Sequence, residues 1–199
     1  MAHTLDFFLE FGSTYSYPAA MRIAPLAAAA GVAVRWRPFL LGAIFKAQGW
    51  PLDSPFNWQV AKGRYMWRDL ARVCADLGLP FQRPNPFPQP SLLAARVAIV
   101  GLEDRWGEDF CRAVYAAEFG AGRQIGDEQV IHDLLGELGV QPDAALARAN
   151  SAAIKAKLRE QTEDAERLGV FGAPSFVVNG ELFWGNDRLE QALAYARKR

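Results

Sequence analysis

LDFFLEFGSTYSY, residues 5–17, is the stretch of this chain that decides its fold. It opens with an apolar and aromatic run, residues 5–11, that is typical of a mostly buried strand. Ser13 follows at the junction with a helix that we expect over residues 16–30, ended by Gly31. The stretch therefore predicts a strand that delivers a hydroxyl group to the start of a helix.

A second stretch, GAPSFVV at residues 172–178, supplies the matching half of the pattern. It predicts a strand that is entered through Pro174. An X-Pro bond is cis in a minority of cases, and in that form the backbone of Ala173 would present an edge able to pair with a peptide-like ligand. The Asn-Gly dipeptide at 179–180 is a strong hairpin signal, so we expect a partner strand over residues 181–184.

The rest of the chain divides into one more strand and a long helical block. Residues 32–39 are β-branched and aromatic, and Pro38 indicates that this strand ends there or lies near a sheet edge. A strand–helix–strand unit of this length favours a right-handed crossover between parallel strands. Residues 41–168 are almost wholly helical in pattern, interrupted by a proline-rich link at 80–88.

The order of elements is thus β-α-β, a helical block, then β-β and a last helix capped by Asn186 or Asp187. This order predicts an α/β, thioredoxin-like fold with a large all-helical insertion. We expect residues 1–40 and 170–199 to form the thioredoxin-like domain and residues 41–169 to form the insertion domain.

Composition limits the class of function. The 199 residues carry 22 acidic and 22 basic side chains, so net charge gives no reason to expect nucleic acid or an anionic membrane as a partner. No stretch is long and apolar enough for a membrane span, and the first residues lack the pattern of a secretory signal. Cys74 and Cys111 are isolated on helical faces, which favours buried thiols in a reducing compartment. We therefore expect a cytoplasmic protein.

The two histidines offer little for catalysis. Neither His3 nor His132 has a cysteine, histidine or carboxylate partner at metal-ligand spacing, so we expect no metal site. Ser13 also lacks the Gly-x-Ser-x-Gly setting of a hydrolase nucleophile.

Ser13 itself allows two interpretations. A thioredoxin-like fold places a Cys-x-x-Cys motif at this turn, but residues 13–16 here are Ser-Thr-Tyr-Ser, so any sulfur must come from a ligand. Ser13 could serve as a helix N-cap, which contributes about 1 kcal/mol. Alternatively, its hydroxyl and the helix N-terminus could stabilise a bound thiolate. Together with Ala173 and the helix start at 186–187, Ser13 suits a ligand with a thiol, peptide amides and an amino-acid end, and glutathione is such a ligand.

Five strings, spread over nearly the whole chain, carry a family resemblance. They are residues 11–17, 40–47, 62–66, 169–176 and 180–189. Through them the chain resembles the 2-hydroxychromene-2-carboxylate isomerases, which are similar to kappa-class glutathione transferases and, more distantly, to DsbA-type oxidoreductases. Thr14 departs from the family, which often has proline there, and so does Trp50-Pro51, where a more polar stretch is usual.

The resemblance implies a role for each site residue. Ser13 would be catalytic, beside the glutathione sulfur. The glutathione site would also contain Lys62, Ala173, Pro174, Asn186 and Asp187. The organic substrate, a small aromatic carboxylate, would meet Lys46, Tyr15 and Asn57. The resemblance also implies a homodimer.

Three functions remain open at this point. The first is a glutathione-dependent cis–trans isomerase that converts 2-hydroxychromene-2-carboxylate to trans-o-hydroxybenzylidenepyruvate, or a similar intermediate of aromatic catabolism. The second is a kappa-like transferase that consumes glutathione, and the third is a non-catalytic glutathione- or peptide-binding module. A dithiol oxidoreductase is disfavoured because the turn has no cysteines. An apolar wall for the substrate ring could come from several aromatic residues, although core or interface packing is the better explanation for most of them: Phe45, Trp50, Phe56, Trp58, Trp67 and Phe87.

Overall fold

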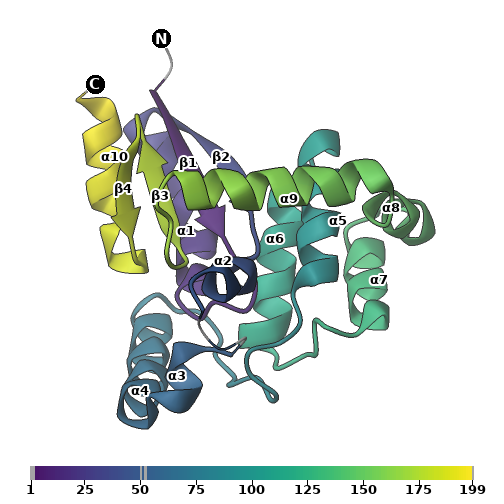
Figure 1. The fold of residues 1–199 in the computed structure, drawn as a ribbon, viewed down its shortest axis with the longest axis horizontal. Helices are drawn as coiled ribbons and strands as arrows, with labels where there is room; N and C mark the ends of the chain where they lie inside the picture. Colours follow the sequence, from purple (N-terminus) through teal and green to yellow (C-terminus); the bar gives the residue numbers. More distant parts are fainter. Residues whose placement is uncertain (1–2, 50, 52, 199) are drawn as a thin grey trace.

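A mixed four-stranded sheet with the strand order β2-β1-β3-β4 forms the centre of the protein (Figure 1). The computed structural model describes residues 3–49, 51 and 53–198. The strands are β1 (His3–Leu9), β2 (Val32–Pro38), β3 (Ser175–Val178) and β4 (Glu181–Trp184). β1 pairs in parallel with β2 and antiparallel with β3, and β3 pairs antiparallel with β4. The parallel crossover and the closing hairpin are therefore confirmed.

The aromatic run of β1 is buried on both faces of the sheet. Phe7 and Phe8 point to opposite faces, and each side chain is fully buried. Phe7 packs between Trp36 and Phe176, with ring centroids 5.0 and 5.4 Å away. Phe8 packs edge-on against Phe39 at 6.0 Å. Since burial of one such side chain contributes roughly 1.5–3 kcal/mol, this run favours an interior position for β1 in the sheet.

Helices cover both faces of this sheet. One face carries α1 (Ser16–Ala30) and α10 (Leu189–Arg197), which pack against each other. The helical block between β2 and β3 supplies the remaining cover, and Figure 1 shows its long helix α9 lying across the sheet. The elements of this block are α2 (Leu41–Ala47), α3 (Pro55–Trp58), α4 (Val60–Asp76), α5 (Leu92–Asp104), α6 (Gly107–Tyr115), the π-helical turn η1 (Ala116–Gly120), α7 (Glu128–Glu137), α8 (Pro142–Ala149) and α9 (Ala152–Arg167). The arrangement is the predicted α/β, thioredoxin-like fold with helices inserted between its second and third strands.

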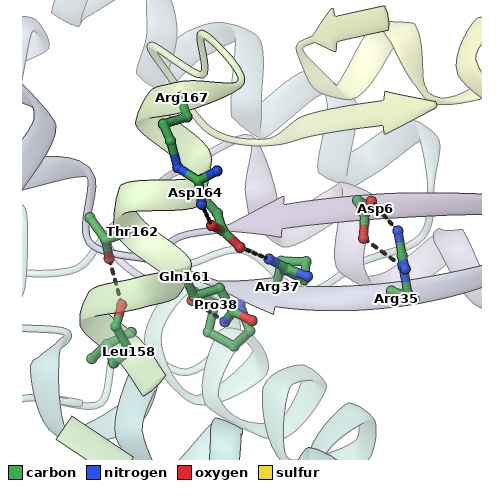
Figure 2. Close-up of polar contacts among 9 residues, drawn as sticks. All are labelled: Asp6, Arg35, Arg37, Pro38, Leu158, Gln161, Thr162, Asp164 and Arg167. Carbon is green, nitrogen blue, oxygen red and sulfur yellow. Dashed lines mark hydrogen bonds and ion pairs between the residues drawn. The ribbon is translucent and has the colours of Figure 1, made fainter. Parts of the chain in front are cut away.

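Polar bonds fasten α9 to the edge strand β2 (Figure 2). Arg37 forms an ion pair with Asp164 at 2.7 Å. Gln161 donates to the carbonyl of Pro38 at 2.6 Å, which satisfies a backbone acceptor that an edge strand leaves open. Pro38 thus ends a strand at the sheet edge, as predicted.

Local residues set several helix ends and turns. The side chain of Asp127 accepts a hydrogen bond from the backbone of Gln129 and so caps α7. Asn179 and Gly180 both have positive φ, 51° and 84°, as a tight hairpin turn requires. Cys74 and Cys111 are free and buried, as expected. Among the described residues, no helix has both the length and the apolar character that crossing a membrane needs.

Two predicted helix caps are wrong. Helix α1 begins at Ser16, and its N-cap Tyr15 makes no side-chain capping bond, so Ser13 does not cap it. Neither Asn186 nor Asp187 caps α10, because a short 3-10 turn, η2 (Asn186–Arg188), comes first and no side chain caps either element. In both cases a bond to a distant part of the chain takes the place of the cap.

Candidate active site

The Ser13 turn and the Pro174 turn face each other in the structure. The hydroxyl of Ser13 donates a hydrogen bond to the carbonyl oxygen of Ala173, 160 residues away, at 2.7 Å. The backbone N–H of Ser13 donates to the carbonyl of Glu10 at 3.1 Å, and the N–H of Ser16 donates to the carbonyl of Ser13 at 3.2 Å. Ser13 is therefore fixed in a tight turn just before α1, with its hydroxyl directed at the Pro174 turn.

The Pro174 turn is held from three sides. The Ala173–Pro174 bond is cis. The carbonyl of Pro174 accepts the N–H of Gly185 at 2.9 Å, and the buried hydroxyl of Ser175 donates to the carbonyl of Gly172 at 2.8 Å. The Trp184 indole lies over Gly172 so closely that a Cβ there would be 2.4 Å from its Nε1. These bonds connect the turn directly to β4 and to the start of η2.

Helix α4 supports the Ser13 turn from the other side. The Thr14 hydroxyl lies 3.1 Å from the sulfur of Met66, and the Tyr15 hydroxyl donates to Asp69 at 2.8 Å. Asp69 also accepts the Tyr65 hydroxyl at 3.3 Å. Burial and the bond to Asp69 raise the pKa of Tyr15 well above its ordinary value, and the carboxylate of Asp187 adds to this rise. Tyr15 and Asp187 are thus near enough for their charges to interact.

Asn186 is held by a side chain that sequence reasoning missed. Arg22 of α1 donates to the Asn186 side-chain oxygen at 3.1 Å and to its backbone carbonyl at 2.6 Å, and it also pairs with Glu190. Arg22 thus occupies one lone pair of the Asn186 side-chain oxygen, and the amide N–H groups are the donors that this side chain can offer a ligand. Its neighbour Asp187 is largely exposed and can reach solvent or a ligand.

The other predicted site residues lie on the helical block. Lys46, on α2, and Lys62, on α4, are exposed, and the Lys62 ammonium is 5.6 Å from the centroid of the Phe56 ring. The amide of Asn57 donates to Asp53 at 2.6 Å and to the carbonyl of Phe87 at 2.8 Å. In the described residues no hydrogen bond or ion pair joins these three side chains to the Ser13 turn, so their roles stay predictions.

Of the aromatic residues considered for the substrate wall, some pack inside the protein and others are exposed. Trp67 and Phe87 pack against each other at 4.7 Å, which supports the packing interpretation for this pair. Trp58 is about half exposed, and Trp50 lies outside the described residues. An aromatic pair that the sequence did not single out, Phe171 and Trp184, stands beside the Pro174 turn with ring centroids 5.0 Å apart and both rings about half exposed.

Comparisons with known proteins identify the family of this chain. The chain belongs to the DsbA-like thioredoxin family, because the sequence model of the DSBA-like thioredoxin domain matches residues 4–196. A 2-hydroxychromene-2-carboxylate isomerase of Sphingobium xenophagum is 30% identical over 98% of both chains. A glutathione S-transferase kappa 2 of Caenorhabditis elegans is 27% identical over 94% of this chain and 88% of its own. A solved 2-hydroxychromene-2-carboxylate isomerase structure superposes with a TM-score of 0.87 at 25% identity, covering 98% of this chain and 95% of the other.

Proposed function

We propose that this protein is a glutathione-dependent isomerase of 2-hydroxychromene-2-carboxylate, or of a similar unsaturated aromatic carboxylate. The observation that carries the proposal is the 2.7 Å bond between the Ser13 hydroxyl and the Ala173 carbonyl. It brings a hydroxyl donor and the peptide backbone of Ala173 together at the turn where a thioredoxin-like fold places a Cys-x-x-Cys motif. The sequence similarity to proteins named as isomerases of this substrate supports the proposal.

The residues present fit glutathione. Ser13 offers a hydroxyl that can turn from the Ala173 carbonyl to a sulfur, and the freed carbonyl can then accept a peptide N–H. The Asn186 amide, oriented by Arg22, offers N–H donors that suit a carboxylate. Asp187, exposed beside it, suits an ammonium group. These four residues would hold the thiol, the peptide and the amino-acid end of one extended ligand.

The proposed chemistry divides between ligand and protein. When bound, glutathione supplies a thiolate that can add to a conjugated carbon and later leave it. While the thiolate is attached, the former double bond is a single bond, and rotation about it is possible. Ser13 stabilises that thiolate by donating a hydrogen bond to the charged form. Tyr15 acts through its ring, since its hydroxyl is bound to Asp69 and its raised pKa keeps it neutral. Lys46 would attract the substrate carboxylate.

The test is an isomerisation assay with and without glutathione. We expect the chromene absorbance to change with multiple turnovers when glutathione is present in catalytic amount, and glutathione to be recovered unchanged. Without glutathione the protein should leave the substrate unchanged beyond the spontaneous rate. Turnover that is independent of glutathione would overturn the proposal.

A kappa-like transferase is the second candidate, because a relative at 27% identity carries that name. The two activities differ in the fate of the thiol. Stoichiometric loss of glutathione with an added electrophile would favour the transferase. Binding of glutathione without any turnover would favour the binding module.

We further propose a homodimer in a reducing compartment such as the cytoplasm. Both cysteines are free and buried, which is typical of proteins that do not rely on disulfides. Sedimentation of the purified protein measures the oligomeric state directly, and a monomer at micromolar concentration would contradict the proposed dimer.

A further inference from the structure

Two large aromatic side chains stand beside the Pro174 turn and remain open to solvent. Phe171 comes just before the turn and Trp184 ends β4, and their ring centroids are 5.0 Å apart. The exposed fractions are 48% for Phe171 and 49% for Trp184. Aromatic side chains of this size are usually buried for the most part, because each carries a large apolar area. Two such rings in contact make a continuous apolar surface, which favours contact with an apolar ligand.

Gly172 holds the Trp184 indole against the turn. A Cβ at Gly172 would lie 2.4 Å from Nε1, 3.0 Å from Cε2 and 3.1 Å from Cδ1 of the indole. The φ of Gly172 is not positive, so glycine is required there for space and not for an unusual backbone conformation. The next residue after Trp184, Gly185, donates its N–H to the carbonyl of Pro174 at 2.9 Å. A ring held in this way loses little conformational entropy when a ligand packs on it.

The aromatic pair lies next to the contact between Ser13 and Ala173. Ala173 follows Gly172 directly, and its carbonyl accepts the Ser13 hydroxyl at 2.7 Å. A sulfur that replaces this carbonyl as the acceptor would therefore lie close to the residue that the indole covers. The group attached to that sulfur would meet the apolar surface of the two rings.

The same face of the sheet carries the helix with Lys46. The strand register places Trp184 opposite Ser175 and Ser175 opposite Phe8, so these three side chains share one face. Phe8 belongs to a buried apolar cluster with Ile44 of α2. Helix α2 also carries Lys46, which we propose for the substrate carboxylate. The rings and the cation thus come from elements that meet on one face of the sheet.

We propose that Phe171 and Trp184 form the wall on which the planar ring of the organic substrate packs. The wall makes the site selective for aromatic over aliphatic carboxylates. The choice of substrate class rests on the proposed function. Aromatic rings prefer offset-stacked or edge-to-face contacts, and this pair, with 59° between its planes, offers both a ring face and a ring edge.

Calorimetry with coumarin-3-carboxylate, a planar aromatic carboxylate that does not isomerise, measures the wall without turnover. Cyclohexanecarboxylate is the reference, because it has the carboxylate but no planar ring. In the wild type the coumarin should bind more tightly. Trp184→Ala should weaken the coumarin about tenfold and cyclohexanecarboxylate less than threefold, with glutathione affinity unchanged. Trp184→Phe should keep most of the affinity, since it keeps a ring.

Gly172→Ala tests the geometry, because the added Cβ displaces the indole without removing it. It should weaken coumarin binding by a similar factor alone and add nothing in a Trp184→Ala background. Leu77→Ala is the control, since Leu77 is also an exposed apolar side chain but stands at the end of α4. It should change neither affinity.

The outcomes separate the wall from the proposed reaction. A wild type without preference for the coumarin, or a Trp184→Ala variant that keeps the preference, would overturn the wall. An equal loss of glutathione affinity in Trp184→Ala would place the rings against glutathione and overturn it too. Conversion of a dimer to a monomer by Trp184→Ala in sedimentation would assign the rings to a subunit contact instead. Loss of the preference as expected, in a protein that does not isomerise its substrate, would count against the proposed function alone.

Discussion

At the scale of single residues, Ser13 carries the most chemistry. Its hydroxyl makes one ordinary hydrogen bond in the free protein, to Ala173 at 2.7 Å, and we propose that a bound thiolate replaces that acceptor. Ser13→Ala should therefore cost only about 1 kcal/mol of unfolding free energy. Glutathione-dependent turnover should fall by roughly 10²- to 10³-fold, since a donor to the reacting charge is lost. Steady-state kinetics and thermal unfolding measure the two effects on one preparation.

Ser151→Ala is a matched control for this variant. Ser151 caps α9 by accepting the N–H of Ile154 at 3.3 Å, away from both turns. Its loss should cost a similar amount, about 1 kcal/mol, and leave turnover unchanged. If both variants turn over like the wild type, Ser13 has no role beyond joining the two turns.

Tyr15 should act by shape and not by proton transfer. Its hydroxyl is bound to Asp69 at 2.8 Å, and burial together with this bond raises its pKa. Tyr15→Phe keeps the ring, so turnover should remain within about threefold of wild type and the pH profile should not change. Tyr15→Ala removes the ring and should raise KM for the organic substrate. If the Tyr15→Phe variant lost the fall in turnover at alkaline pH that the wild type shows, the hydroxyl would have to transfer a proton.

At the scale of elements, the packing of α3 on α4 depends on one glycine. A Cβ at Gly63 would lie 1.9 Å from the carbonyl oxygen of Phe56, which leaves no room unless the two helices separate. Gly63→Ala should therefore destabilise the protein by about 1–3 kcal/mol. Because α3 carries Asn57, which we expect to meet the organic substrate, KM for that substrate should rise as well.

Gly42→Ala in α2 is the comparison for Gly63→Ala. Nothing lies within 4 Å of a Cβ at Gly42, so the added methyl group should stabilise the helix by up to about 1 kcal/mol and leave binding unchanged. Equal stability of the two variants in urea would contradict the contact between α3 and α4.

The elements could be predicted because local chemistry determines them. Residues 16–30 form a helix that ends at Gly31, and residues 181–184 form the second strand of the hairpin, as the sequence indicates. The two cap predictions failed where a side chain found a distant partner: Ser13 bonds to Ala173, and Asn186 is bound by Arg22, 164 residues away. No periodicity or spacing signals such a pair.

The same reason explains which parts of the candidate site were missed. Asp69 lies 54 residues from Tyr15 in the sequence, on an ordinary amphipathic helix, and nothing in its local pattern marks it. Glu10 did carry a signal, since it is a charged residue that follows an apolar strand and comes three positions before Ser13. A carboxylate in that setting needs donors, and the structure supplies them from Gly12 and Ser91.

At the scale of the whole molecule, the fold explains why the two turns meet. β1 and β3 are adjacent and antiparallel, so the last residue of β1 and the first residue of β3 lie at the same end of the sheet. The helical block leaves the sheet after β2 and returns before β3, and it contributes α4 against the Ser13 turn (Figure 1). Residues that are far apart in the sequence therefore lie close together at the end of the sheet where β1 finishes.

The carboxyl groups of Glu10 and Glu118 should also make global stability depend on pH. Burial raises the pKa of Glu10 from its ordinary value of 4.5 to about 7 in the folded protein, so the folded state binds its proton more tightly than the unfolded state does. The stability that this proton contributes is complete below about pH 4.5 and is lost as pH rises through about 7, by up to about 3 kcal/mol. Burial also raises the pKa of Glu118 well above its ordinary value, so its proton contributes to stability in the same direction.

Urea unfolding of wild type and Glu10→Gln across this range tests the prediction. Glutamine does not titrate, so the unfolding free energy of wild type relative to the variant should fall steadily from acid pH to just above neutral. Asp6→Asn, which removes an exposed ion pair, should run parallel to wild type throughout. Parallel curves for wild type and Glu10→Gln would mean that Glu10 stays ionised in the folded protein.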